Sequence, residues 1–289
     1  MKIDGKTQLI GLLGWPVSHT KSPMLHNAAA RAHQLNFAYL PLPVHPEGIG
    51  AAINGLPALG FKGVNVTVPH KQAVMEYLDE IDPAAEAIGA VNTITFNDQI
   101  DGSFPPKSIG YNTDWIGFKQ DLESRGVDFT GRDCVVLGAG GSARAILYAL
   151  LKAEANVYLY ARRPEQAHAL KEDMQNTFAH SQIAAGSLSD IDSILSKLSK
   201  PLIINTTPVG MHPNIDESIW PDDRKFPAGS FLYDLIYNPP ETKLMAQARA
   251  AGIEAANGLG MLLGQGAEAF RIWTGVYPDL TVMEKGLYS

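Results

Sequence analysis

The chain has 289 residues, a length that predicts two domains rather than one. It carries 30 Asp and Glu against 23 Lys and Arg, and this net charge of −7 excludes a general nucleic-acid binder, which needs a basic surface. The single cysteine, Cys134, excludes an internal disulfide and a multi-cysteine zinc site, and it fits a reducing cytoplasm. No apolar run approaches the roughly 18 residues of a membrane span, so we expect no membrane partner.

Short β-rich runs alternate with helical stretches over the first part of the chain. Prolines mark the starts of the expected helices, because proline is tolerated in a first helical turn. This alternation predicts an α/β domain with a mostly parallel sheet. The expected strands are residues 8–15, 37–44, 63–68, 90–96 and 109–112, and the expected helices are residues 23–34, 46–59 and a further one from Pro69.

The alternation restarts near residue 131, which predicts a second α/β domain. Its expected strands are residues 134–137, 156–160, 202–205 and 231–235, with a helix that ends near residue 153. An apolar helix is expected over residues 258–274, near the C-terminus. We therefore expect residues 1–113, completed by residues 258–289, to form one domain, and residues 114–257 to form the other.

A glycine-rich turn opens the second domain between a strand and a helix. Gly138 permits the tight turn, Gly140 lets the backbone approach a pyrophosphate, and Ala143 is small enough for close helix–strand packing. The helix N-terminus then presents free N–H groups to the phosphates. The pattern predicts a Rossmann dinucleotide site; the alternative is a tight turn that binds no ligand. The cofactor-contacting residues are Gly138, Ala139, Gly140, Gly141, Ser142 and Ala143.

The end of the next strand indicates which cofactor is used. NAD sites usually place an acidic residue there, where it bonds the ribose 2′-hydroxyl. This chain instead has Arg162 and Arg163, whose guanidinium groups suit the 2′-phosphate of NADP. We therefore predict NADP, with NAD as the alternative. If the two arginines bind no cofactor, they are simply a solvated pair on the surface.

Polar residues emerge at the end of the strand over residues 63–68. Period-2 alternation separates the valines from Asn65 and Thr67, which share one face. Such strand ends are where parallel α/β proteins build sites. Lys71 follows, in a first helical turn if Pro69 begins a helix, and there the helix dipole disfavours a cation. An aspartate partner would favour the cation instead, so the sequence leaves the sign of the net effect open.

These motifs together resemble the shikimate dehydrogenase family along nearly the whole chain. The resemblance implies reversible NADPH-dependent reduction of 3-dehydroshikimate to shikimate in aromatic amino-acid biosynthesis, by a substrate domain and a Rossmann domain. The matching segments are residues 14–23 (GWPVSHTKSP), 65–71 (NVTVPHK), 90–93 (AVNT), 110–114 (GYNTD), 138–143 (GAGGSA), 205–211 (NTTPVGM), 233–237 (YDLIY) and 258–265 (GLGMLLGQ).

The resemblance also implies residue roles. Lys71 and Asp114 become the proton-transfer pair, with Lys71 donating to the developing alkoxide and Asp114 orienting it. Thr20 and Ser22 are implied to hold the substrate carboxylate. The remaining implied substrate contacts are Asn65, Thr67, Asn92, Tyr237 and Gln265, and the further cofactor contacts are Arg162, Arg163, Thr206, Gly258 and Met261.

Two departures from the family pattern bear on specificity. Threonine stands at Thr20 where the family usually has serine, which raises the hypothesis of an altered tolerance for quinate. Arg163 replaces a usual threonine, and Gln166 stands where a further arginine is common, which weakens the case for NADP over NAD.

Other functions remain as alternatives at this point. They are an NAD-preferring quinate/shikimate dehydrogenase, a noncatalytic ligand sensor, and another two-domain lysine-using dehydrogenase such as one acting on folates. A sensor needs neither Lys71 nor Asp114, which argues against it. His19, His26 and His33 recur at a spacing unsuited to metal binding, so we expect no metal. We expect a monomer or homodimer.

Overall fold

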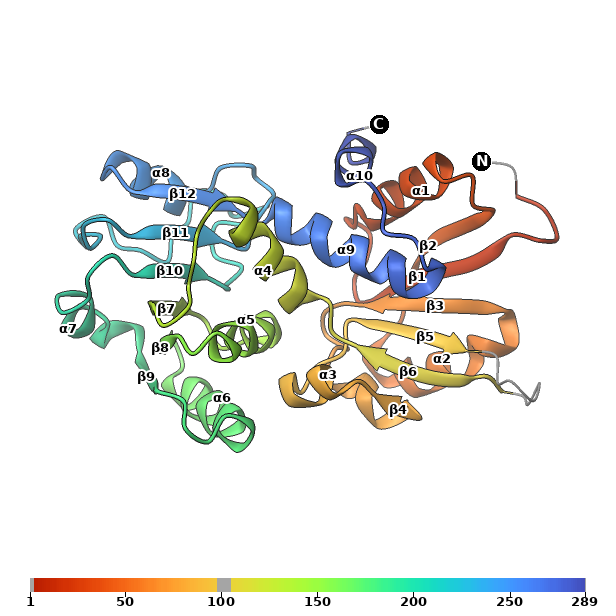
Figure 1. Ribbon diagram of the computed structural model, residues 1–289, viewed down its shortest axis with the longest axis horizontal. Coiled ribbons are helices and arrows are strands. Elements are labelled where there is room, and N and C mark those ends of the chain that lie inside the picture. The colour runs from red at the N-terminus through yellow and green to blue at the C-terminus, as the bar shows by residue number, and fades with distance from the viewer. Residues whose placement is uncertain (1–2, 98–104, 289) are drawn as a thin grey trace. The chain divides into compact units, whose positions relative to one another are not determined.

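A computed structural model describes residues 3–97 and 105–288, and the chain divides into two units (Figure 1). Residues 1–117 and 263–289 form the first unit, and residues 118–262 form the second. The chain passes between them inside two helices, α4 (Asp114–Ser124) and α9 (Leu259–Thr274). Within the described ranges, no helix is long and apolar enough to span a membrane.

The first unit is built on a six-stranded sheet in the order β2-β1-β3-β5-β6-β4. β1 runs parallel to β2 and β3, and β4 runs parallel to β6, whereas β5 is antiparallel to both of its neighbours. The sheet is thus parallel-rich, as predicted, with one reversed strand. Its strands are β1 (Gln8–Gly14), β2 (Phe37–Pro43), β3 (Phe61–Val66), β4 (Glu80–Ile81), β5 (Thr93–Asn97) and β6 (Lys107–Tyr111).

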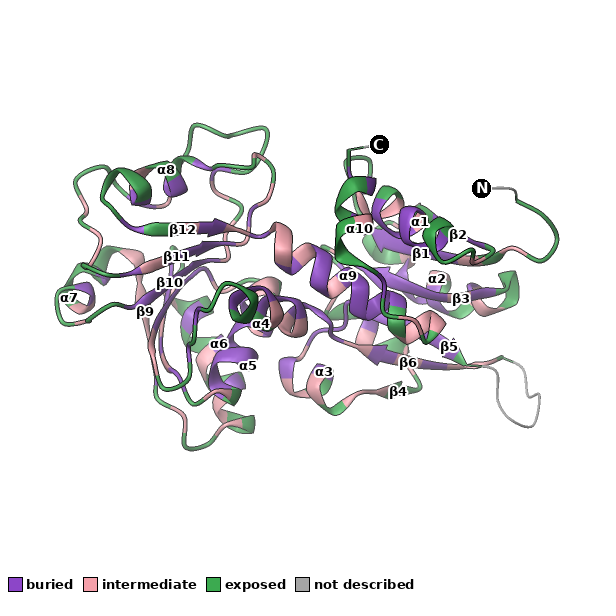
Figure 2. Ribbon diagram, turned by 45° about the horizontal axis from the view of Figure 1, so that its top comes forward, coloured by how far each residue is buried: buried purple, intermediate pink, exposed green. Residues whose placement is uncertain are grey.

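The helices of the first unit bury the inner strands of this sheet. Val64 and Ile94 are fully buried at its centre and belong to the same core cluster as Ile53 of α2. Figure 2 shows these strands as buried, whereas α10 is largely exposed. The helices are α1 (Ser22–Ala32), α2 (Ile49–Gly55), α3 (Pro83–Ile88) and α10 (Leu280–Gly286), with the short 3₁₀ segments η1 (Pro46–Gly48), η2 (Pro57–Leu59) and η3 (Ala73–Tyr77).

Two predicted helices of the first unit are wrong in detail. The helix expected over residues 46–59 is broken into η1, α2 and η2, because Pro57 lacks an N–H and its ring crowds the preceding turn. No α-helix begins at Pro69. The carbonyl of Lys71 accepts from the N–H of Val91 at 2.8 Å, so it is bonded to a neighbouring segment rather than within a helix. Lys71 therefore lies in a turn before η3, and the expected helix-dipole effect on it does not apply.

The second unit is a parallel six-stranded sheet in the order β12-β11-β10-β7-β8-β9. Counted from β7, this is the 3-2-1-4-5-6 order of a Rossmann fold. The order reverses between β7 and β10, and ligands of such sheets bind at the carboxyl ends of the strands there. The strands are β7 (Asp133–Leu137), β8 (Asn156–Ala161), β9 (Ile183–Ser187), β10 (Leu202–Asn205), β11 (Phe231–Asp234) and β12 (Glu254–Asn257).

The central strands of the second unit are fully buried, which explains their unbroken apolar sequences. Cys134 lies in β7 as a small buried side chain, and burial raises the pKa of its thiol to about 12. The outer face of α8 is exposed in Figure 2. The helices are α5 (Gly141–Lys152), α6 (Pro164–Thr177), α7 (Asp192–Leu195) and α8 (Lys243–Ala250), with the 3₁₀ segment η4 (Leu188–Asp190).

Candidate active site

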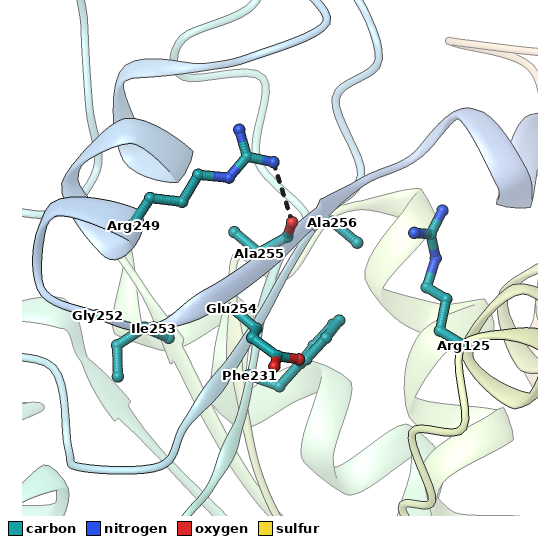
Figure 3. Close-up of a pocket in the computed structure, with 8 residues that line it drawn as sticks. All are labelled: Arg125, Phe231, Arg249, Gly252, Ile253, Glu254, Ala255 and Ala256. Carbon is teal, nitrogen blue, oxygen red and sulfur yellow. Dashed lines mark hydrogen bonds between the residues drawn. The ribbon is translucent and has the colours of Figure 1, made fainter.

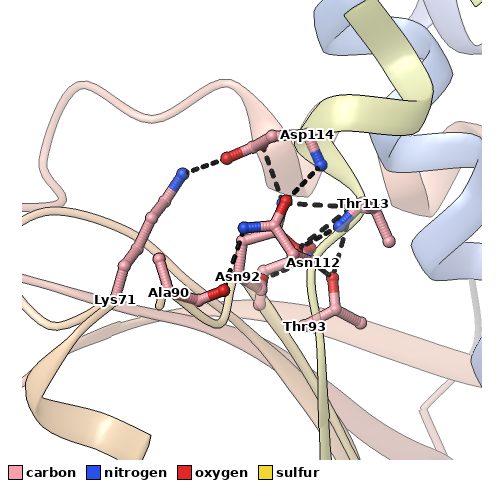
Figure 4. A network of polar contacts seen from close by, with 8 residues as sticks. Lys71, Ala90, Asn92, Thr93, Asn112, Thr113 and Asp114 are labelled. Carbon is pink, nitrogen blue, oxygen red and sulfur yellow. Dashed lines mark hydrogen bonds and ion pairs between the residues drawn. The ribbon is translucent and has the colours of Figure 1, made fainter. Parts of the chain in front are cut away.

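Lys71 and Asp114 form an ion pair in the first unit (Figure 4). Nζ of Lys71 lies 2.6 Å from Oδ2 of Asp114, and the side chains are 16% and 9% exposed. An ion pair this well covered is screened little by salt. The structure thus brings together the two residues, 43 positions apart, to which the family resemblance assigns proton transfer.

Asn92 holds the other oxygen of the same carboxylate. Its Nδ2 donates to Oδ1 of Asp114 at 2.8 Å and to the hydroxyl of Thr113 at 3.0 Å. The orientation of the amide is fixed, because its Oδ1 accepts from the backbone N–H of Thr113 at 2.8 Å and an N–H can only donate. Asp114 therefore accepts a hydrogen bond at each carboxylate oxygen, from two residues of the predicted site.

Asn65 joins this network through Thr93. Its Nδ2 donates to the backbone carbonyl of Asn92 at 3.1 Å and to the Thr93 hydroxyl at 3.0 Å. Its Oδ1 accepts from the hydroxyl of Tyr39 at 2.7 Å. Tyr39 in turn stacks on His26, with ring centroids 4.3 Å apart. Four predicted site residues, Lys71, Asp114, Asn92 and Asn65, are thus linked by one continuous set of hydrogen bonds.

Hydrogen bonds to backbone groups hold the segments that carry this network. Asn112 donates from Nδ2 to the carbonyl of Ala90 at 2.9 Å and accepts at Oδ1 from the N–H of Asp114 at 3.0 Å (Figure 4). The N–H of Asn92 donates to the carbonyl of Tyr111 at 2.9 Å. The segments around residues 90 and 112 are therefore fixed to each other through their backbones as well as their side chains.

Thr20 and Ser22 are also brought together, at the start of α1. The Thr20 hydroxyl accepts from the N–H of Ser22 at 3.2 Å and donates to the Ser22 hydroxyl at the same distance. Both residues are half-buried. Thr67 follows β3 and is also half-buried, and its carbonyl accepts from the N–H of His70 at 2.9 Å. Gln265 lies on the part of α9 that belongs to the first unit.

The glycine turn of the second unit lies between β7 and α5, as predicted. Gly138 has φ 105°, and a Cβ there would lie 2.7 Å from Oγ1 of Thr206. Thr206 follows β10 and donates to the carbonyl of Leu137 at 2.8 Å, which joins the two strands at the point where their order reverses. Gly140 and Gly141 are exposed with open space where a Cβ would stand, and Ala143 is fully buried. Ala139 and Ser142 are half-buried within the same turn.

Arg162 and Arg163 follow β8 at the same carboxyl edge of the sheet. Both are exposed, and among the described residues neither has an ion-pair partner. No acidic side chain stands between the end of β8 and Glu165, so the segment directly after this strand carries two cationic groups that can meet an anion. A 2′-phosphate suits such a pair, since guanidinium groups bind phosphates in bidentate geometry.

The other predicted residues of the second unit lie beyond β11. Burial raises the pKa of the half-buried Tyr237. A Cβ at Gly258 would lie 2.1 Å from the carbonyl oxygen of Leu235, so only glycine allows this close approach. Met261 is buried on the first turns of α9.

Four side chains of the network in the first unit were not predicted: Tyr39, Thr93, Asn112 and Thr113. Thr93, Asn112 and Thr113 lie one or two positions from a predicted residue within a matched segment, and this proximity was the available signal. Tyr39 is distant in sequence, and nothing short of the fold places it against Asn65.

A separate cavity of about 490 Å³ opens at the amino-terminal ends of β11 and β12 (Figure 3). Arg125 and Arg249 flank it, and Glu254 lies between them. Arg249 donates to the outward carbonyl of Ala255 at 3.2 Å, which caps this sheet edge. The cavity contains none of the residues predicted for substrate or cofactor.

Comparison with known proteins yields consistent matches. Residues 12–94 match the shikimate dehydrogenase substrate binding domain, and residues 258–287 match the shikimate 5′-dehydrogenase C-terminal domain. A shikimate dehydrogenase (NADP⁺) from Carboxydothermus hydrogenoformans is 42% identical over 99% of this chain and of its own. One from Citrifermentans bemidjiense is 44% identical, over 99% of this chain and 97% of its own.

Solved structures show the same likeness. A shikimate dehydrogenase crystallised with NADP⁺ has a TM-score of 0.90 and 42% identity, covering 99% of this chain and 96% of its own. The enzyme from Thermus thermophilus, in complex with NADP(H) and shikimate, has a TM-score of 0.84 and 33% identity, covering 98% of this chain and 99% of its own.

Proposed function

The chain belongs to the shikimate dehydrogenase family, and on that premise we propose that it reduces 3-dehydroshikimate reversibly to shikimate with NADPH. This is an oxidoreductase reaction of aromatic amino-acid biosynthesis. The observation that carries the proposal is the covered Lys71–Asp114 ion pair, since it offers a proton donor in a site otherwise lined by neutral hydrogen-bonding groups.

Lys71 is the proposed proton donor. Its Nζ carries the proton that the substrate oxygen takes up during reduction, and the same group receives it back in the oxidation direction. Asp114 orients Lys71 and accepts from a substrate hydroxyl. Asn65, Thr67, Asn92, Tyr237 and Gln265 recognise the remaining hydroxyl and carboxylate groups, and Thr20 and Ser22 bind the carboxylate. Several neutral partners suit a substrate with many hydroxyls, because an analogue that lacks one leaves a buried group unpaired.

NADP fits the glycine turn of the second unit. The turn needs glycine at Gly138, and the open space at Gly140 and Gly141 lets a pyrophosphate approach the N-terminus of α5. Arg162 and Arg163 would hold the 2′-phosphate, and Gly258 and Met261 would lie against the nicotinamide. When bound, NADPH supplies the hydride.

We assign substrate binding to the first unit and cofactor binding to the second, Rossmann unit. The predicted boundaries, residues 1–113 completed by 258–289 and residues 114–257, differ from these units by a few residues near the crossing helices α4 and α9, which leaves Asp114 in the first unit and Gly258 and Met261 in the second. The net charge of −7 supports a small-molecule enzyme without a nucleic-acid partner. The single buried cysteine supports a cytoplasmic protein. The proposed assembly is a monomer or homodimer, which sedimentation would distinguish.

The test is an assay at 340 nm in which shikimate or quinate is crossed with NADP⁺ or NAD⁺. Shikimate with NADP⁺ should give the highest kcat/KM, and Lys71→Ala should abolish it. A preference for NAD⁺ would favour the quinate/shikimate dehydrogenase alternative. Absence of turnover in all four combinations would contradict the proposal and favour a ligand sensor.

A separate variant, Arg162→Gln, tests the preference for NADP⁺ over NAD⁺. Arg162→Gln should raise the KM for NADP⁺ about tenfold, because it removes one charged partner of the 2′-phosphate, and should leave the KM for NAD⁺ unchanged. An exposed arginine elsewhere on the chain, Arg31, provides the matched control as Arg31→Gln. Equal KM changes for both cofactors would remove Arg162 from the 2′-phosphate site.

A further inference from the structure

We propose that Thr93 is a positioning residue for this reaction, one whose hydroxyl holds Asn65 and Asn92 in a single orientation. Through Asn92 it fixes the carboxylate of Asp114. The inference rests on the proposed function, because it assigns a role in the same site. It concerns a side chain that contacts neither Lys71 nor Asp114 directly.

The direction of each hydrogen bond around Thr93 follows from backbone groups that can only donate or can only accept. The backbone carbonyl of Asn92 can only accept, so the amide end of Asn65 facing it is Nδ2. The backbone N–H of Thr113 can only donate, so the end of Asn92 facing it is Oδ1. Thr93 Oγ1 therefore meets a donor, Nδ2 of Asn65 at 3.0 Å, and an acceptor, Oδ1 of Asn92 at 3.0 Å.

Only a side chain that donates and accepts at one atom can bridge these two amides. A hydroxyl does so with its single hydrogen and its lone pairs. Thr93 is 0% exposed, so bulk water cannot take its place. Its backbone is also fixed, because β5 pairs it with Asn65 on one side and with Tyr111 on the other.

The effect of Thr93 reaches the ion pair in two further steps. Asn92 donates from Nδ2 to Oδ1 of Asp114 at 2.8 Å, and Lys71 donates to Oδ2 at 2.6 Å (Figure 4). Without the Thr93 hydroxyl, Oδ1 of Asn92 loses one donor and keeps only those of Thr113, its N–H at 2.8 Å and its hydroxyl at 3.2 Å. The amide then keeps its end-for-end orientation but is held less tightly, so the Asp114 carboxylate and its contact with Lys71 are positioned less precisely.

The test compares Thr93→Val with Thr93→Ser in the shikimate and NADP⁺ assay. Valine keeps the shape and removes the hydroxyl, so kcat/KM should fall about tenfold, as for one buried hydrogen bond. Serine keeps the hydroxyl and should stay within about twofold of wild type. Thr95→Val is the matched control, because Thr95 lies on the same face of β5, is buried, and donates to Oδ1 of Asn97 at 3.0 Å outside the network.

A double-mutant cycle separates positioning from a merely structural role. If Thr93 acts through Asn92, Thr93→Val should cost less than about twofold in an Asn92→Ala background. Equal costs in both backgrounds, a wild-type kcat/KM in Thr93→Val, or failure of serine to restore activity would each overturn the inference. If melting curves show that Thr93→Val does not fold, Thr93→Ala takes its place in the cycle. A wild-type chain without turnover would overturn the proposed function itself, and that failure appears before any variant is made.

Discussion

Lys71 and Asn92 contact opposite oxygens of one carboxylate, that of Asp114. Nζ of Lys71 lies 2.6 Å from Oδ2, and Nδ2 of Asn92 lies 2.8 Å from Oδ1. Both atoms donate to Asp114 in this arrangement, and the Asn92 amide cannot reverse because the N–H of Thr113 fixes its oxygen. The site therefore requires a group with two acceptor atoms at position 114.

Asp114→Asn should lower kcat/KM for shikimate by a factor of about 10²–10³, within the range of a lost general acid–base arrangement. The asparagine has one oxygen for two donors, so its Nδ2 must face either Lys71 or Asn92. Steady-state kinetics measure the loss, and melting temperature confirms folding. Asp79→Asn is the control, because Asp79 pairs with Ser108 outside the network. Activity of Asp114→Asn within about threefold of wild type would contradict the prediction.

Thr20→Ser should change the ratio of kcat/KM for quinate to that for shikimate. The Thr20 hydroxyl is oriented by two contacts with Ser22, so serine can keep both while it removes only the methyl group. Quinate carries a saturated carbon with a hydroxyl beside its carboxylate, and it needs more room there than shikimate. We expect the ratio to rise severalfold in Thr20→Ser. A ratio equal to that of wild type would show that the methyl group does not set this preference.

The sequence predicted the fold class and the central strands because buried parallel strands form unbroken apolar runs, as at residues 134–137. The ends of helices were harder to predict. A proline can either begin or interrupt a helix, so the sequence does not predict the interruption at Pro57 and wrongly predicts a helix start at Pro69. The latter error arose because Lys71 bonds its carbonyl to Val91, a contact with a distant segment that no local pattern reveals.

The residues of the candidate site likewise fall into those that could be predicted before the structure and those that could not. Side chains inside short motifs, such as Lys71 and Asp114, could be predicted because those motifs resemble the shikimate dehydrogenase family. The partner of Asn65 could not, because Tyr39 lies on β2, and its apolar ring and high burial resemble those of an ordinary core residue. Hydrogen-bond direction also needed the structure, since it depends on which backbone groups face each amide.

Gly138→Ala and Gly140→Ala should have different effects on stability and cofactor binding. Alanine at Gly138 must adopt φ near 105° and would place its Cβ 2.7 Å from Thr206 Oγ1, so we expect a loss of about 1–3 kcal/mol in the free energy of unfolding. At Gly140 φ is −90° and a Cβ meets open space, so stability should not change, while the KM for NADP⁺ should rise. Chemical denaturation and kinetics measure the two effects. Equal losses of stability in both variants would contradict this assignment.

His26 should make the first unit less stable in mild acid. Burial lowers the pKa of His26 to about 3, and its ring stacks on Tyr39. The ordinary pKa is about 6.5, so below that pH the unfolded chain takes up a proton that the folded chain does not. This stability is fully present above pH 6.5 and is lost as the pH falls, by about 2 kcal/mol at pH 5. His26→Phe keeps a ring against Tyr39 and removes the titration, so its melting temperature should fall by several degrees less than that of wild type between pH 7.5 and pH 5. His168 is exposed, so the control variant His168→Phe should show the same pH dependence of melting temperature as wild type. Parallel curves of melting temperature against pH for wild type and His26→Phe would refute the prediction.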